Sequence, residues 1–80
     1  MREDRVYEGI ITMYYNGAVE NQELYAGRSR EVAMYVDGFR DLGLSGKTIT
    51  RLNGSIDVEI RGKIKETRVY ITGTLTPLPL

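Results

Sequence analysis

Residues 26 to 30, AGRSR, are the first group in this sequence that could bind a ligand. Arg28 and Arg30 flank Ser29 at the predicted start of a helix, where free backbone N–H groups attract phosphate or carboxylate. The stretch lacks the glycine and lysine spacing of a P-loop or a dinucleotide-binding loop. Ser29 is also a common N-cap residue. Two interpretations therefore stay open: an anion site, or an ordinary helix start.

Residues 61 to 68, RGKIKETR, are the second candidate, and their basic side chains are Arg61, Lys63, Lys65 and Arg68. In a β-hairpin three of these share one face with Tyr70, and Lys65 lies in the turn. A basic ribbon beside an aromatic ring can follow a phosphate backbone and stack on a base. The alternative is a solvated hairpin whose lysines discourage pairing between sheet edges. Zero net charge and the nearby Asp57 and Glu59 favour this alternative.

Six tyrosines form the third feature. At least two are predicted to lie on the sheet face away from the helix, where a tyrosine ring offers contact area at low entropic cost. The candidates for such an interaction surface are Tyr14, Tyr25 and Tyr70, together with Leu78 and Leu80 near the C-terminus. Tyrosines that fill the rim of a thin core are the other interpretation.

The carboxylates Asp37, Asp41, Asp57 and Glu59 are the last chemical candidates, for acid–base work or a hard cation. Asp37 and Asp41 lie one helical turn apart beside Arg40, which is typical of a solvated helix face. The sequence has no cysteine and no histidine, so the commonest zinc ligands and the usual general base near neutral pH are missing. We therefore expect no enzyme activity, no metal site and no cofactor.

The elements that position these groups follow from hydrophobic periodicity. Residues 5 to 15 predict a strand that stops at the tight turn Asn16-Gly17, and a second strand returns and ends near Tyr25. Whether residues 18 to 22 are strand or loop is open. A helix from Arg30 to Leu42 is predicted, with Ser29 as N-cap and Gly43 as its left-handed end. Its apolar face comprises Val32, Tyr35, Val36, Phe39 and Leu42, and Gly38 is expected to permit close packing.

Residues 44 to 75 predict a three-stranded meander with turns at Asn53-Gly54 and Lys65-Glu66. The second turn pairs Ile60 with Ile71 and Lys63 with Arg68, giving one apolar face and one charged face. The first turn places Ile49 opposite Val58. The apolar face is expected to meet Val32, Val36 and Phe39 of the helix through Ile56, Val58, Ile60, Val69 and Ile71.

These elements predict one α+β domain over residues 1 to 80: a two-layer fold, β-β-α-β-β-β, with an antiparallel sheet of about five strands and one helix packed on one face. Residues 76 to 80, TPLPL, are expected to form a tail, because Pro77 and Pro79 do not suit a central strand. Residues 9 to 15 form the longest nearly apolar run, which is too short for a bilayer.

From these features we expect a cytoplasmic protein without a membrane partner. The favoured function is a small non-enzymatic protein-interaction module, an accessory, adaptor or inhibitor-like protein that self-associates as a homo-oligomer. The alternative is a nucleic-acid-binding protein that uses the basic hairpin, with Arg28 and Arg30 as further anion contacts.

Overall fold

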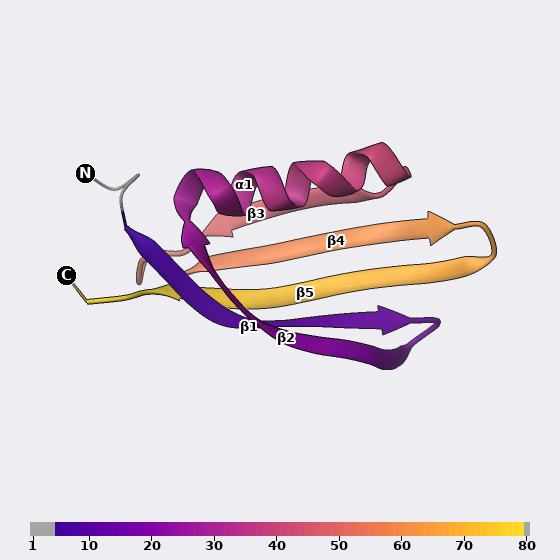
Figure 1. The fold of residues 1–80 in the computed structure, drawn as a ribbon, viewed down its shortest axis with the longest axis horizontal. Helices are drawn as coiled ribbons and strands as arrows, with labels where there is room; N and C mark the ends of the chain where they lie inside the picture. Colours follow the sequence, from indigo (N-terminus) through magenta and orange to yellow (C-terminus); the bar gives the residue numbers. More distant parts are fainter. Residues whose placement is uncertain (1–4, 80) are drawn as a thin grey trace.

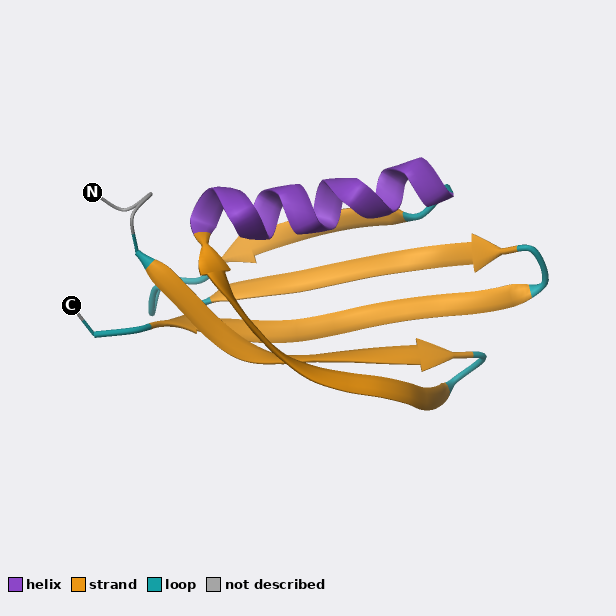
Figure 2. Cartoon of the chain, in the orientation of Figure 1, coloured by secondary structure: helices purple, strands orange, loops and turns teal. Residues whose placement is uncertain are grey.

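The computed structural model describes residues 5 to 79, which form one antiparallel sheet with a helix on one of its faces (Figure 1, Figure 2). The elements in chain order are β1 (Val6–Tyr15), β2 (Ala18–Arg28), α1 (Ser29–Gly38), the 3-10 turn η2 (Phe39–Leu42), β3 (Ser45–Thr50), β4 (Ile56–Ile64) and β5 (Thr67–Pro77). The five strands lie in the spatial order β2-β1-β5-β4-β3. The predicted two-layer α+β fold with one helix is confirmed.

The first hairpin is longer than the sequence predicts. Asn16 and Gly17 have φ values of 50° and 87°, as a two-residue hairpin turn requires, and Tyr15 pairs with Ala18. β2 then continues to Arg28, so the open question about residues 18 to 22 is settled as strand. The register shifts between Met13 and Tyr14, which leaves Glu20 as a bulge. Polar side chains are tolerated here because β2 is an edge strand.

The β4–β5 hairpin has the predicted register. Ile60 pairs with Ile71 and Lys63 pairs with Arg68 on either side of the turn at residues 65 and 66. Apolar and charged residues alternate along both strands, so a slip of one residue would bury the charged set. This alternation determines the pairing.

β3 differs from the prediction by one residue, because Ile49 lies opposite Asp57 rather than Val58. The loop before β4 is closed by a hydrogen bond from Arg51 N to Ser55 O, 2.8 Å long. Three residues lie between these two, and Gly54 has a positive φ of 90° whereas Asn53 does not, so the loop is not a two-residue type I′ turn. The extra residue shifts the register of β3 by one, which moves its side chains to the opposite faces of the sheet. Ile49 is therefore 47% exposed on the face away from the helix.

The helix begins earlier than predicted, and Ser29 is not its N-cap. β2 pairs with β1 as far as Arg28, which keeps Arg28 extended and makes it the residue before the first helical one. The Glu31 carboxylate accepts a hydrogen bond from the Arg28 N–H at 2.8 Å, so a side chain of the helix itself caps the free amide. At the other end, Gly43 has a φ of 85° and closes the last turn as predicted.

The core lies between α1 and the facing side of the sheet. Its buried residues are Tyr7, Ile11, Val32, Val36, Leu44, Ile56, Val58, Ile60, Val69, Ile71 and Leu75, and Phe39 and Tyr35 pack against its rim. The prediction that Leu42 belongs to the apolar helix face is wrong, since Leu42 is exposed. The helix tightens to a 3-10 turn after Gly38, which changes the spacing of the face, and Leu44 is buried instead.

The C-terminal segment does not behave as a separate tail. β5 includes Pro77, which pairs with Tyr7, and the Leu78 N–H donates to Val6 O at 2.8 Å. The predicted tail is therefore wrong for residues 76 and 77, which belong to β5. A proline is tolerated here because β4 begins at Ile56, opposite Leu75, so no β4 residue lies opposite Pro77 to accept a hydrogen bond from an N–H. Leu78 is half-buried, and Leu80 lies outside the described residues.

Candidate functional site

The side of the sheet away from α1 is here called the open face, and it carries several of the candidate residues (Figure 2). Strand alternation and the registers place on it Glu8, Ile10, Thr12, Tyr14, Val19, Gln22, Leu24, Ser45, Lys47, Ile49, Asp57, Glu59, Arg61, Lys63, Arg68, Tyr70, Thr72 and Thr74. Within residues 5 to 79, α1 packs on the opposite side and no other helix covers this one. Two parts of the open face differ in chemistry.

The first part is the basic tyrosine cluster, which we define as Tyr14, Arg61, Lys63, Arg68 and Tyr70. These five residues line one shallow groove together with Gly17, Gly62 and Val69. The ring centroids of Tyr14 and Tyr70 are 5.9 Å apart with an interplanar angle of 32°. The Arg61 guanidinium carbon lies 5.2 Å from the Tyr70 centroid, a cation–π distance. The structure thus brings three of the predicted basic residues together with two of the predicted tyrosines.

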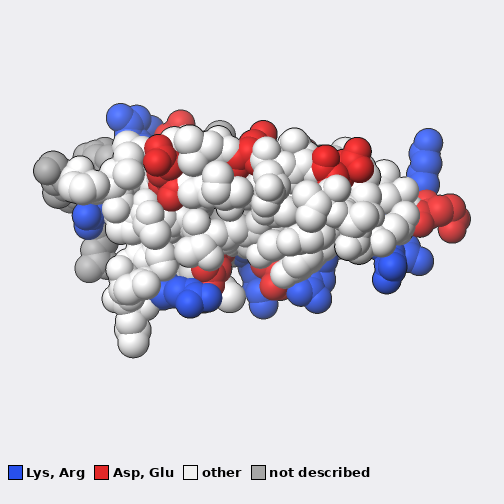
Figure 3. Space-filling model, turned by 90° about the horizontal axis from the view of Figure 1, so that it is seen from below, with Lys and Arg blue, Asp and Glu red and all other residues white. Residues whose placement is uncertain are grey.

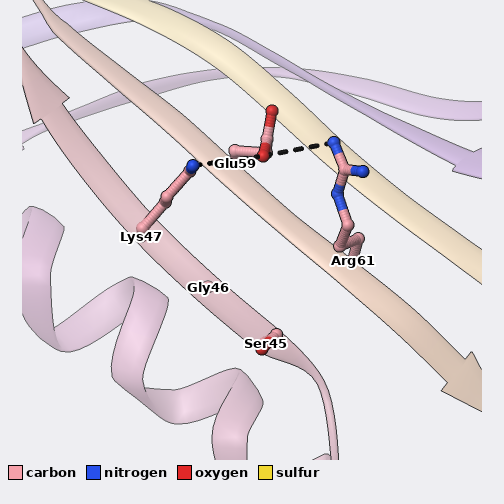
Figure 4. A pocket seen from close by; sticks show the side chains of 5 residues that line it. All are labelled: Ser45, Gly46, Lys47, Glu59 and Arg61. Atoms are coloured by element: carbon pink, nitrogen blue, oxygen red, sulfur yellow. Dashed lines mark ion pairs between the residues drawn. The ribbon is translucent and has the colours of Figure 1, made fainter.

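Glu59 is the carboxylate next to this cluster, and two cations share it (Figure 4). One Glu59 oxygen lies 3.2 Å from Arg61 Nη2 and 4.0 Å from Lys47 Nζ, and Ser45 and Gly46 line the same hollow. Lys63 and Arg68 form no ion pair with any residue from 5 to 79. One carboxylate does not neutralise so many cations, so this end of the open face has an excess of positive charge.

Asp57, one of the predicted carboxylates, is held by neighbours on the same face. Its oxygens accept hydrogen bonds from Thr74 Oγ1 at 2.8 Å and from Arg51 Nε at 2.6 Å. The Thr74 bond, and then the Arg51 bond, lower the pKa of the Asp57 carboxyl below its ordinary value of 3.8. The ionised Asp57 carboxylate therefore links the loop after β3 to β5 on the open face.

A pH dependence of stability follows from this lowered pKa. The ionised Asp57 contributes stability above its unfolded-state pKa, and that contribution is lost as pH falls through the folded-state value. Urea unfolding from neutral pH down to about pH 2 should show wild type more stable than Asp57→Asn at neutral pH, with the difference shrinking in acid. A difference that does not change with pH would contradict this role.

The second part of the open face is apolar and was not predicted as a site. Ile10 and Leu24 pair across β1 and β2, and their side chains are 51% and 63% exposed; we call them the Ile10–Leu24 patch. Val19 is also exposed further along β2. The alternation of side chains in residues 5 to 15 already placed Ile10 on the face opposite to Ile11. The polar run VENQE, residues 19 to 23, gave no reason to expect that Leu24 would lie next to Ile10.

Tyr25 does not belong to the open face, contrary to the predicted interaction surface. It pairs with Gly9 and lies on the helix side, where its ring centroid is 4.9 Å from that of Tyr35. Its hydroxyl donates to Glu31 O at 3.2 Å, and burial raises the pKa of both tyrosines above 10.0. Tyr25 therefore supports the rim of the core, the other interpretation offered for the tyrosines.

The remaining candidates stay apart. At the start of α1 the Glu31 carboxylate accepts the hydrogen bond of the Arg28 N–H. This amide is therefore not free to bind an anion, and the arrangement gives no support to an anion site with Arg30. Asp37 lies on α1 and Asp41 on η2, away from Asp57 and Glu59 on β4. Between residues 5 and 79 no three carboxylates are grouped so that they could hold a metal ion, and no helix is long and apolar enough to cross a membrane.

The fold and this surface define a two-layer α+β protein with an uncovered sheet face that is apolar at the β2 edge and basic and aromatic near the β4–β5 turn. Comparison with protein-family models, with curated proteins and with solved structures finds no match to the chain.

Proposed function

We propose that this protein is a small non-enzymatic interaction module that self-associates through the β2 edge and the adjoining Ile10–Leu24 patch. The observation that carries the proposal is the position of two exposed apolar side chains beside an unpaired strand edge. An edge strand presents free N–H and C=O groups to any strand that can approach it. A partner strand that pairs with the β2 edge would therefore form backbone hydrogen bonds and bury apolar side chains at the same place.

A second copy of this chain fits the β2 edge well. Antiparallel pairing centred on Leu24 places Leu24 opposite Leu24 of the second copy and joins the two patches into one apolar stripe. The same register brings Glu20 at one end of β2 toward Arg28 of the second copy, so opposite charges meet at both ends. The arrangement has two-fold symmetry, the commonest symmetry among soluble oligomers.

The two edges of the sheet also explain why association would stop at a dimer. The other edge, β3, has only six residues and carries Lys47, both of which discourage further pairing. The Glu20 bulge limits regular pairing on β2 to the residues that follow it. Each copy therefore has one edge suited to pairing, and that edge is used up in the dimer.

Light scattering tests this proposal. We expect wild type to have twice the chain mass of 9.1 kDa, and Leu24→Glu to be a monomer, because two like charges would face each other at the centre of the interface. Met34→Glu is the matched control, since Met34 is 68% exposed on the outer side of α1, and it should leave the mass unchanged. A monomeric wild type, or a dimeric Leu24→Glu, would refute self-association through β2.

A further inference from the structure

We infer that the basic tyrosine cluster binds single-stranded nucleic acid, with bases on Tyr14 and Tyr70 and phosphates on Lys63 and Arg68. This site lies on the open face but uses none of the residues assigned to self-association. The inference therefore does not depend on the dimer.

The aromatic side of the site is preformed. Tyr70 lies between Tyr14 at 5.9 Å and the Arg61 guanidinium at 5.2 Å, and both rings are half-buried against the sheet. Rings held in this way lose little conformational freedom on binding. The Arg61 guanidinium lies over the Tyr70 ring, so a base that stacks on this face takes the place of the guanidinium. Gly17 lines the same groove and adds no side chain that would block it. Stacking on tyrosine tolerates any base, because every base has a π-face.

The charges of the site complement a phosphate backbone. Residues 61 to 68 carry four basic side chains and one acidic one. Lys63 faces Arg68 across the hairpin, and neither has an ion-pair partner among residues 5 to 79.

The zero net charge of the chain does not oppose this inference, because the charges are separated in space. α1 and η2, on the side of the sheet opposite to the cluster, carry three carboxylates and two basic side chains, so this side is slightly acidic: Glu31, Asp37 and Asp41 against Arg30 and Arg40. Figure 3 looks onto the long side of the molecule and shows most acidic atoms along one border and most basic atoms along the other. A polyanion responds to the local field of one face rather than to the total charge.

A single strand fits the groove better than a duplex or an acidic peptide. The faces of paired bases are hidden in a duplex, so the two tyrosines would have nothing to stack on. An acidic peptide would use the cations but would gain little from the rings. Replacing the two tyrosines should therefore weaken the binding of a single strand but not that of a duplex or an acidic peptide.

Fluorescence anisotropy with a short labelled oligothymidylate tests the inference. We expect Lys63→Glu/Arg68→Glu to raise Kd at least tenfold, and Tyr14→Leu/Tyr70→Leu to raise it at least fivefold without any change of charge. For two lost phosphate contacts, the slope of log K against log salt should decrease in magnitude by about 1.4. Circular dichroism would show that each variant is folded.

Met34→Glu/Arg40→Glu is the matched control, because it lowers the net charge by three on the helix side, against four in the cluster variant. It should leave Kd within about twofold of wild type. An equal loss in this control would show that net charge, not the cluster, governs binding. Retained affinity in the tyrosine variant, or equal competition by a duplex or by polyglutamate, would also overturn the inference.

Discussion

Replacing Ile60 by alanine is expected to lower the free energy of unfolding by about 2 to 5 kcal/mol, the range for truncating a buried isoleucine. Ile60 is 0% exposed at the centre of β4, faces the equally buried Ile71 on β5, and lies on the sheet side that packs under Val36 of α1. Neighbours on three elements surround the side chain, so the cavity would not close easily. A loss of this size is a large part of the stability of a small domain. Urea unfolding followed by circular dichroism measures it.

Ile49→Ala is the control with the same chemical change. Ile49 is 47% exposed on the open face of β3, so its truncation should cost less than about 1 kcal/mol. The comparison also tests the register of β3. If Ile49→Ala cost as much as Ile60→Ala, Ile49 would point into the core, as a two-residue turn at Asn53-Gly54 would require.

These two isoleucines show what the sequence could and could not predict about the fold. The β4–β5 register follows from alternation alone, because every slip by one residue would move Arg61 and Lys63 into the core. β3 has the sequence SGKTIT, with only one large apolar side chain, so alternation does not constrain its register. The loop decides it instead, and the sequence does not show that three residues rather than two lie between Arg51 and Ser55.

The errors at the helix start and at the C-terminus have a common cause. Whether Ser29 caps α1 depends on how far β2 stays paired with β1, and whether Pro77 ends β5 depends on where β4 begins. Both are properties of a neighbouring strand rather than of the local residues. Local propensity predicts the type of each element but not these ends.

The candidate site was predictable in part for similar reasons. Alternation within one hairpin places Arg61, Lys63 and Arg68 on the face of Tyr70. That Tyr14 lies beside Tyr70 depends on β1 pairing with β5, two segments from opposite ends of the chain. Tyr25 faces the helix side because the residues of β2 beyond the Glu20 bulge continue in a shifted register. Neither long-range pairing nor a bulge has a signal in these residues.

The second large effect is expected from Gly9→Ala in β1. A methyl group at Gly9 would overlap the carbonyl oxygen of Thr74 and lie 3.0 Å from Leu75 Cδ2. β1 bends along its length (Figure 1), and it pairs with β5 at Glu8 and again at Ile11, on either side of Gly9. The obstructing atom belongs to the backbone, so the strands would have to separate to make room. We expect a loss of about 1 to 3 kcal/mol in urea unfolding, the range for overpacking a well-packed site.

Gly38→Ala is the matched control, and it should change stability in the opposite direction. Gly38 has helical angles, φ −60° and ψ −27°, and no atom lies within 4 Å of the position that a Cβ would take. The close packing predicted for this glycine is therefore absent, and alanine should stabilise the protein by about 0.5 to 1 kcal/mol through its higher helix propensity. A loss of stability in Gly9→Ala and a gain in Gly38→Ala would show that the close contact between β1 and β5 is what excludes a side chain at Gly9. If Gly9→Ala were neutral or stabilising, β1 and β5 would not approach as closely as the structure shows, and the β1–β5 pairing that brings Tyr14 beside Tyr70 would have to be revised.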